Sequence, residues 1–283
     1  MAKIIFNKEF FNIFDTLSCG QVFRFKAMPL GFKVFSTNKM AKLYYSNDQV
    51  IVECEDSDLD YFYNYFDLDR DYQEIFESAK KENIEILEKA STYSKGIRIL
   101  RQDIFECLVS FIISQNNNIK RISGSIEKLC ENLGEQRESM GEKYYTFPSV
   151  KSLASASEDT YRSFGLGYRA EYVKRLAVAV EKGLDLASYS SLDTRQLKKK
   201  LTELYGVGDK VANCVILFGY GRTDSFPVDT WIEKVYKQDL MGKLTDREKI
   251  SEQLINRFKK NSGIYQQYLF HYKRNIEKAI KNG

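Results

Sequence analysis

The hydrophobic pattern of this chain changes its period near residue 58, and this change constrains the fold more than any other feature. Before it, short aromatic and β-branched runs alternate with turn residues, as in Phe32–Phe35, Leu43–Tyr45 and Val50–Val52. After it, apolar residues such as Leu59 and Phe62 recur at helical spacing. The pattern predicts an α+β protein in which a small N-terminal antiparallel β-sheet domain packs on a mainly α-helical, two-part body.

Helical patterns dominate from Gly96 onward. Asp103 is a candidate N-cap for an apolar stripe that includes Leu108 and Ile112. We therefore place a β-rich domain at residues 1–95 and a helical body at residues 96–283. Glycine and proline indicate loops within the body near Gly134–Pro148, Gly165–Gly167 and Gly219–Pro227.

The composition is that of an ordinary globular protein, with 43% hydrophobic and 29% charged residues. No apolar run approaches the roughly 18 residues of a membrane span. The N-terminal residues lack the apolar core and small-residue cleavage site of a signal peptide. We expect a cytoplasmic protein, associated with the nucleoid if the organism is bacterial.

Cysteine and histidine content limits the chemistry that is open to the chain. The five cysteines lie at least 23 residues apart, so the spacing of an iron–sulfur cluster is absent and free thiols are expected. His271 is the only histidine, which excludes a histidine-rich metal site. We expect no cofactor, and catalysis that depends on Lys, Asp, Glu, Cys or Tyr.

The net charge of +4 is unevenly distributed along the chain. Residues 53–88 hold thirteen acidic and three basic residues, a net charge of −10, whereas residues 89–283 carry a net charge of +10. A basic C-terminal two-thirds is compatible with a polyanionic partner such as DNA, although many enzymes are this asymmetric without binding nucleic acid.

Residues 196–220 hold the most informative stretch. A helix is predicted over Leu197–Tyr205, a turn at Gly206-Val207-Gly208, and a second helix over Asp209–Phe218. Two glycines allow a sharp turn and a close approach of the backbone, and the amides at the start of the second helix favour an anion such as a phosphate. A helix–hairpin–helix holds DNA in this way without reading its sequence. A plain αα-hairpin closed by glycine remains the competing interpretation.

Lys210 opens the second helix, and Asp229 follows Pro227 as a candidate cap of a helix over Thr230–Leu240. A lysine and an aspartate that face one cleft suit chemistry at a sugar C1′, because a neutral amine can attack as a nucleophile while a carboxylate stabilises positive charge. The alternative is a surface lysine and an aspartate that only caps its helix.

Five segments of the chain resemble a known family. Leu204–Cys214 together with Pro227-Val228-Asp229 resembles the helix–hairpin–helix/Gly-Pro-Asp DNA glycosylases. Gly96–Asp103, Ser114–Ile122 and Gly165–Ala170 resemble the 8-oxoguanine DNA glycosylase/AP lyases of the eukaryotic-like type found in bacteria. The resemblance implies a base-excision repair enzyme that flips 8-oxoguanine paired with cytosine out of duplex DNA, cleaves its glycosidic bond and nicks the strand by β-elimination.

The resemblance implies roles for the residues that match. Lys210 is the expected Schiff-base nucleophile and Asp229 the catalytic carboxylate. The expected substrate-base pocket comprises Gly20, whose carbonyl would accept a hydrogen bond from the N7–H of 8-oxoguanine, with Cys214, Phe270 and Gln266. Guanine has an acceptor at N7, so two acceptors would face each other unpaired. From the pattern alone, Gly20 is a turn glycine, and Cys214 and Phe270 are core residues.

The resemblance also implies contacts to the DNA around the flipped base. Asn116, Arg121 and Arg169 match contacts to the unpaired cytosine, and Tyr168 matches a wedge in the base stack. Read without the family, they are a polar loop and solvated helix residues. Trp231 stands where relatives outside bacteria have a phosphate-binding histidine, and its indole N–H can still donate one hydrogen bond. With the hairpin glycines, the expected DNA-binding residues are Asn116, Arg121, Tyr168, Arg169, Gly206, Gly208 and Trp231.

Two other functions stay open at this point. Another glycosylase of the superfamily, such as an alkylated-base enzyme, needs only the aspartate and water, so Lys210 argues against it. A non-catalytic DNA-binding module would not need both Lys210 and Asp229. We expect double-stranded DNA as the partner, no membrane association, and a monomer.

Overall fold

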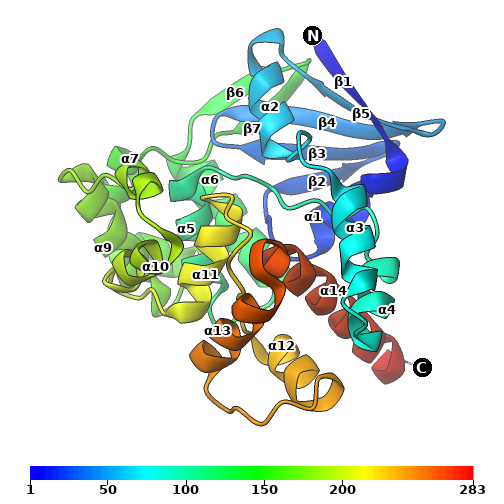
Figure 1. Cartoon of the computed structure of the whole chain (residues 1–283). Helices are drawn as coiled ribbons and strands as arrows, with labels where there is room; N and C mark the ends of the chain where they lie inside the picture. The colour runs from blue at the N-terminus through cyan, green and yellow to red at the C-terminus, as the bar shows by residue number, and fades with distance from the viewer. Residues whose placement is uncertain (283) are drawn as a thin grey trace.

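The computed structural model describes residues 1–282. Its N-terminal part is a five-stranded antiparallel sheet with the strand order β1-β5-β4-β3-β2 (Figure 1). The expected α+β fold is confirmed: the sheet precedes a mainly helical body. The strands are β1 (Ala2–Asn7), β2 (Phe25–Met28), β3 (Gly31–Ser36), β4 (Lys39–Ser46) and β5 (Gln49–Cys54).

The three predicted strand runs fall in β3, β4 and β5. Val34 lies opposite Ala41, and Leu43 lies opposite Val52, so these buried apolar residues meet on the face of the sheet that contributes to its core. Strand β1 pairs with β5, and β2 pairs with β3. The sequence analysis did not find β1 and β2, because their short segments do not alternate cleanly between apolar and polar residues.

Helices of the first hundred residues connect the sheet to the body. Helix α2 packs against β1 and β5, whereas α4 packs against the long C-terminal helix α14, as Figure 1 shows on the right. The first part of the chain therefore contacts the last. These helices are α1 (Ile13–Ser18), α2 (Leu59–Tyr65), α3 (Tyr72–Lys81) and α4 (Glu85–Tyr93), and α14 spans Ser262–Asn282.

The body is helical except for one small hairpin. Its other helices are α5 (Ile104–Ser114), α6 (Ile119–Leu133), α7 (Val150–Ser155), α8 (Glu158–Ser163), α9 (Arg169–Glu181), α10 (Thr194–Thr202), α11 (Asp209–Phe218), α12 (Thr230–Lys234) and α13 (Arg247–Phe258). The hairpin of β6 (Gln136–Ser139) and β7 (Glu142–Tyr145) lies inside the stretch that was predicted to be a loop. The helix predicted over Thr230–Leu240 ends at Lys234, and a π-helical turn, Val235–Asp239, follows it.

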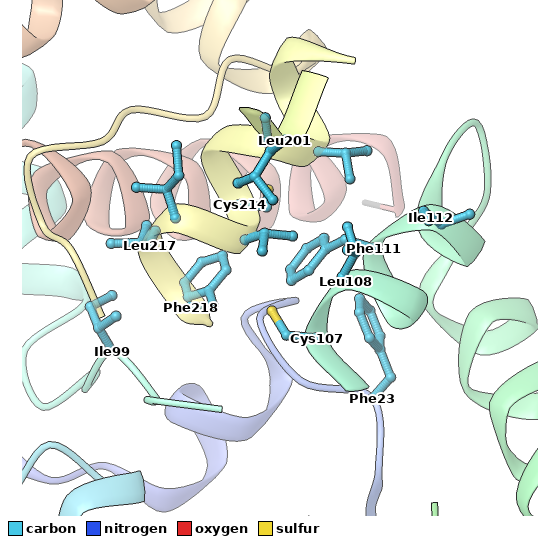
Figure 2. Packing of buried hydrophobic residues seen from close by; sticks show 14 of the residues in the cluster. Phe23, Ile99, Cys107, Leu108, Phe111, Ile112, Leu201, Cys214, Leu217 and Phe218 are labelled. Carbon is cyan, nitrogen blue, oxygen red and sulfur yellow. The ribbon is translucent and has the colours of Figure 1, made fainter. Parts of the chain in front are cut away.

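The core of the body lies between α5 and α11. Phe111 and Phe218 stack with their ring centroids 5.5 Å apart and their planes 12° from parallel. Figure 2 shows both rings beside Cys107 and Cys214, with Phe23 of the N-terminal part packed below. All five cysteines are free and buried. Helix α11 is thus fixed along its apolar face, which positions its N-terminus.

We use the name Arg98 seam for residues 96–102 together with the groups of the N-terminal part to which they bind. The seam lies between the sheet and the body. Arg98 is fully buried, and its guanidinium donates hydrogen bonds to the carbonyls of Phe10, Phe66, Asp67 and Arg70. At the end of the same segment, the Gln102 N–H donates a hydrogen bond to the Phe218 carbonyl of the body at 2.7 Å.

Two further properties concern the molecule as a whole. Within residues 1–282, no helix combines the length and the apolar character that crossing a bilayer requires. Among the same residues, no group of three or more His, Cys, Asp and Glu side chains converges in a way that could hold a metal ion.

Candidate active site

Lys210 stands at the second position of α11, directly after the hairpin. Gly208 is the N-cap of this helix and has an extended backbone. The Lys210 side chain is half-buried, and its Nζ lies 5.0 Å from the centroid of the Phe111 ring. Cys214 lies one turn further along the helix, and its thiol interacts with the lysine amine. The fold therefore places this amine beside an aromatic wall and a buried thiol.

Asp229 is held by the start of α12. Its Oδ1 accepts hydrogen bonds from the backbone N–H groups of Trp231 and Ile232, both at 3.0 Å, so the predicted helix cap is confirmed. Burial raises the pKa of the Asp229 carboxyl above its ordinary value, and the two backbone bonds and the positive charge of Lys210 oppose this rise. The carboxylate is thus rigidly oriented and partly desolvated.

The six residues predicted for catalysis and for the base pocket line a single cavity, which we call the Lys210 pocket. Helix α11 contributes Lys210 and Cys214, and α14 contributes Gln266 and Phe270. The other two of the six, Gly20 and Asp229, lie in the loops after α1 and before α12. The complete lining is Gly20, Phe111, Lys210, Cys214, Phe218, Pro227, Asp229, Gln266, Gln267 and Phe270.

The Lys210 pocket is small in this structure, with a volume of about 50 Å³. A water molecule needs about 10–15 Å³ of such a cavity, so the space suits a few waters as the side chains stand. Half-buried Phe270 forms one of its walls. A base can therefore enter only if side chains such as Phe270 move. A larger cavity of about 390 Å³ lies against β2, β3 and α6 and contains none of the predicted site residues.

Hydrogen bonds from side chains of α14 fix the loop that carries Gly20. Gly20 has a φ of +89°, a conformation that glycine adopts without strain. The carbonyl of the preceding Cys19 accepts a hydrogen bond from Gln267 Nε2 at 3.0 Å, and the Ser18 carbonyl accepts one from Arg274 Nη2 at 3.0 Å. Gln21, which follows, is buried and bonded to Arg98 and Leu100 of the Arg98 seam. The loop therefore has little freedom to move.

The buried thiols around the pocket are poor nucleophiles. Burial raises the pKa of the Cys214 thiol, against an opposing effect of Lys210, and raises the pKa of Cys19 to about 11. Burial also raises the pKa of Cys107 well above its ordinary value. Because thiolates are the reactive form, these cysteines are inert at neutral pH. Lys210 is therefore the better candidate for a nucleophile.

The hairpin differs slightly from its prediction, because α10 ends at Thr202 and not at Tyr205. Gly206 has a φ of +82°, and a Cβ at this position would lie 2.3 Å from Tyr172, so no other residue fits here. By contrast, Gly208 is exposed and a Cβ there would meet nothing within 4 Å. The open backbone at Gly208 leaves space for a ligand at the N-terminus of α11.

The residues predicted to contact the unpaired cytosine gather around the loop between α5 and α6. Asn116 is exposed with a φ of +46°, and Arg121 is also exposed. Tyr168 is 52% exposed. Arg169 is buried instead: its guanidinium lies 4.4 Å from the centroid of the Tyr168 ring and donates to the carbonyls of Gln115 and Asn116. The structure thus places all four residues around this loop, but the Arg169 guanidinium is already hydrogen-bonded to backbone carbonyls of the protein.

Trp231 lies beside Asp229, whose carboxylate accepts its backbone N–H. The Trp231 side chain is half-buried, and Lys234 Nζ lies 4.8 Å from the centroid of its ring. This position, next to the pocket and a lysine, is compatible with a phosphate contact.

The sequence analysis missed three residues that hold the site together. Gln115 accepts hydrogen bonds from Arg169 and donates to the Gly206 carbonyl at 2.9 Å, which connects the α5–α6 loop to the hairpin. Gln267 and Arg274 fix the Gly20 loop. Only Arg274 had a signal in the sequence, since Gln266, Phe270 and Arg274 follow one another at four-residue spacing. Gln115 and Gln267 act through backbone carbonyls, which no sequence pattern reveals.

The class of protein follows from this site together with two family matches. Residues 109–260 match the family described as HhH-GPD superfamily base excision DNA repair protein. Residues 3–108 match the 8-oxoguanine DNA glycosylase N-terminal domain. The chain therefore belongs to the helix–hairpin–helix/Gly-Pro-Asp superfamily of base-excision repair proteins, in its 8-oxoguanine DNA glycosylase family.

Individual relatives support the same assignment and specify the activity. The Clostridium acetobutylicum 8-oxoguanine glycosylase/lyase, solved in complex with double-stranded DNA containing cytosine opposite to 8-oxoguanine, is 34% identical, with a TM-score of 0.90 over 95% of this chain and 93% of that one. A probable N-glycosylase/DNA lyase of Methanothermobacter thermautotrophicus is 29% identical over 74% of this chain and 72% of its own length. The N-glycosylase/DNA lyase of Saccharomyces cerevisiae is 29% identical over 84% and 70%. This chain is accordingly a bifunctional N-glycosylase/DNA lyase.

Proposed function

We propose that this enzyme removes 8-oxoguanine paired with cytosine from duplex DNA, with Lys210 as the nucleophile and Asp229 as the catalytic carboxylate. The observation that carries the proposal is that both residues line one cavity with Gly20, Gln266 and Phe270. The cavity thus combines a nucleophile, a carboxylate and the groups that a purine needs for recognition.

The chemistry assigns separate roles to the two catalytic residues. The neutral Lys210 amine attacks C1′, the bond from C1′ to N9 breaks, and the base leaves with the bonding electrons and takes up a proton. The Asp229 carboxylate, oriented by two backbone N–H groups, stabilises the positive charge that develops on the sugar. The attacking amine loses a proton, the C1′–O4′ bond of the aminal breaks, and O4′ takes up a proton, which opens the sugar to a Schiff base between Lys210 and C1′. This Schiff base acidifies the C2′ hydrogens. Loss of one of them as a proton expels the 3′ phosphate and nicks the strand.

Recognition of the damaged base rests on two acceptors. The Gly20 carbonyl is proposed to accept the N7–H that 8-oxoguanine has and guanine lacks. Gln266 is buried, and its Oε1 has no hydrogen-bond partner within the part of the chain that the structure describes. An unpaired buried acceptor is costly, and the N–H groups on the Watson–Crick edge of the base would satisfy it. Cys214 and Phe270 would enclose the two faces of the ring.

Recognition of the opposite cytosine is proposed for Asn116, Arg121 and Arg169, with Tyr168 filling the gap in the stack. Exposed Tyr168 and Arg121 are accessible to DNA as they stand. Arg169 would have to exchange at least one of its bonds to the carbonyls of the α5–α6 loop. The Gly206–Gly208 turn and Trp231 are proposed to hold backbone phosphates, which is a contact without sequence preference.

Borohydride reduction tests the proposed nucleophile. It should trap a covalent complex of the wild-type enzyme with a duplex that contains 8-oxoguanine opposite cytosine, and Lys210→Gln should abolish the complex because an amide forms no Schiff base. Lys198→Gln, which removes a lysine of α10 paired with Asp209 and Glu248, is the matched control and should trap normally. Trapping by Lys210→Gln at the wild-type level would show that another amine is the nucleophile.

A further inference from the structure

Arg274 extends the row of pocket residues on α14 by one helical turn. Gln266, Phe270 and Arg274 are spaced by four residues, so they share one face of the helix. The Arg274 guanidinium carbon lies 5.1 Å from the centroid of the Phe270 ring. Its Nη1 lies 3.4 Å from the place that a Cβ on Gly20 would occupy. The guanidinium therefore adjoins two walls of the Lys210 pocket.

The guanidinium of Arg274 is buried with most of its hydrogen-bonding capacity unused. Arg274 is 7% exposed, and only Nη2 has a partner, the Ser18 carbonyl. Nε and Nη1 are inaccessible to solvent and have no hydrogen-bond partner among residues 1–282. Burial lowers the pKa of Arg274 below its ordinary range, against the opposing effects of Cys19 and Asp229. Unpaired donors on a buried charge cost free energy of folding, and native proteins rarely contain them.

Arg98 shows how this fold treats an arginine whose role is structural. Arg98 is also buried, at 0% exposure, and each of its three nitrogens donates to at least one backbone carbonyl. It also contacts the Tyr72 ring, with 4.2 Å from the guanidinium carbon to the centroid. Arg274 makes the ring contact but has a carbonyl acceptor, that of Ser18, for Nη2 alone. Packing an arginine therefore does not explain Arg274, whereas an acceptor brought by a ligand does.

We infer that Arg274 is a further residue for recognition of the damaged base, and that Nη1 donates a hydrogen bond to the O8 carbonyl oxygen of the flipped 8-oxoguanine. This inference rests on the proposed function, in which the Gly20 carbonyl accepts the N7–H. O8 is bonded to C8, the neighbour of N7, so a donor beside Gly20 meets O8 when the carbonyl meets N7–H. Gly20 and Arg274 would form an acceptor–donor pair that matches the N7–H and O8 pair, which undamaged guanine does not have.

The test measures how strongly the enzyme prefers the lesion over guanine, by competition binding in a Lys210→Gln background so that no chemistry occurs. Arg274→Met removes the donors and retains most of the side-chain volume. We expect the preference for 8-oxoguanine opposite cytosine to fall about 30-fold, the effect of one charge-assisted hydrogen bond. Arg257→Met is the matched control, because Arg257 also contacts a phenylalanine ring, that of Phe258, but is exposed and away from the pocket. It should leave the preference unchanged.

Two further measurements separate recognition from a structural role. Nicking of a preformed abasic site needs Lys210 but no base, so the Arg274→Met single variant should lose far less of its nicking rate than of its preference for the lesion. A parallel loss of nicking would overturn the inference in favour of a structural role. Repeating the competition with 8-oxoadenine should show the same fold loss. This base keeps O8 and N7–H, but it has an amino group in place of O6 and lacks the N1–H and the 2-amino group. A loss confined to 8-oxoguanine would overturn O8 as the partner.

The result also distinguishes this inference from the proposed function. If the wild-type enzyme releases 8-oxoguanine and Arg274→Met keeps the full preference for the lesion, the inference about Arg274 alone is wrong. If the wild-type enzyme neither prefers nor releases 8-oxoguanine, the proposed function is wrong and the inference is overturned with it.

Discussion

The Arg98 seam and the Lys210 pocket each bury polar side chains in the interior of the same small protein, and they differ in how those side chains are paired. In the seam, Arg98 and Gln21 bond to backbone carbonyls and amides in several directions. In the pocket, Gln266 Oε1 and two nitrogens of Arg274 have no partner. One seam atom, Asp67 Oδ1, also has no hydrogen-bond partner among residues 1–282, but it forms an ion pair with Arg101. Paired groups stabilise the fold, whereas the unpaired groups of the pocket leave their hydrogen-bonding capacity to a ligand. The difference indicates which polar residues serve the fold and which serve the substrate.

The strongest test of this comparison replaces the two arginines by methionine. Arg98→Met leaves four carbonyls without their buried donor, and we expect the free energy of unfolding to fall by about 3–5 kcal/mol. Arg274→Met removes a buried charge that is mostly unpaired, so the free energy of unfolding should stay within about 1 kcal/mol of wild type or rise. Urea unfolding at neutral pH measures both. Equal losses for the two variants would contradict the division into seam and pocket.

Asp229 offers a second test because it combines a structural bond with a proposed catalytic role. Asparagine caps helices about as well as aspartate, so Asp229→Asn should change the free energy of unfolding by less than about 1 kcal/mol. The rate of base release should fall by about 100-fold or more, because the neutral amide no longer stabilises positive charge on the sugar. Single-turnover release of 8-oxoguanine measures the rate.

The chain contains a matched control for this substitution. Asp246 caps α13 in the same way, with its Oδ1 accepting from the N–H groups of Glu248 and Lys249 at 2.8 and 3.0 Å. Asp246→Asn should leave both the rate and the stability nearly unchanged. If Asp246→Asn slows release as much as Asp229→Asn, the effect comes from helix capping and the catalytic assignment is wrong.

Much of the fold could be predicted from the sequence because its period changes so clearly. The strands around Val34, Leu43 and Val52 and the stripe on α5 follow from alternation and helical spacing. Strands β6 and β7 were missed because four-residue strands rich in charge look like a loop. The end of α12 was missed because a π-helical turn continues a helical pattern without a signal of its own. The domain boundary near residue 95 stays a prediction.

More of the candidate site was predicted from the family resemblance than from sequence patterns. Spacing alone indicated an anion-binding turn with Lys210 and a cap at Asp229, whereas Gly20, Gln266 and Phe270 were identified by their likeness to a family. They lie up to 250 positions apart, and only the packing of α14 on the Gly20 loop brings them together. Unpaired atoms such as Arg274 Nη1 are a property of three-dimensional packing, so no sequence pattern could have indicated them.

The smallest expected effect concerns the pH dependence of base release. It distinguishes the buried carboxylate of Asp229, which is proposed to act in catalysis, from the carboxylate of Asp246, which only caps a helix. Burial raises the pKa of Asp229, so this group becomes protonated at a higher pH than an ordinary aspartate does. Because the ionised form is proposed to act, protonation of Asp229 should add a second acidic limb, a further fall of about tenfold per pH unit below that pKa, to the acid dependence that a neutral amine nucleophile already imposes. This added limb should begin above the ordinary range near 3.8. Asp229→Asn should lose this acidic limb while keeping its lower rate. The exposed cap Asp246 has a pKa that its backbone bonds lower, so Asp246→Asn should retain the limb. An added acidic limb that persists in Asp229→Asn would assign the titration to a different group and leave Asp229 without evidence of an ionised catalytic state.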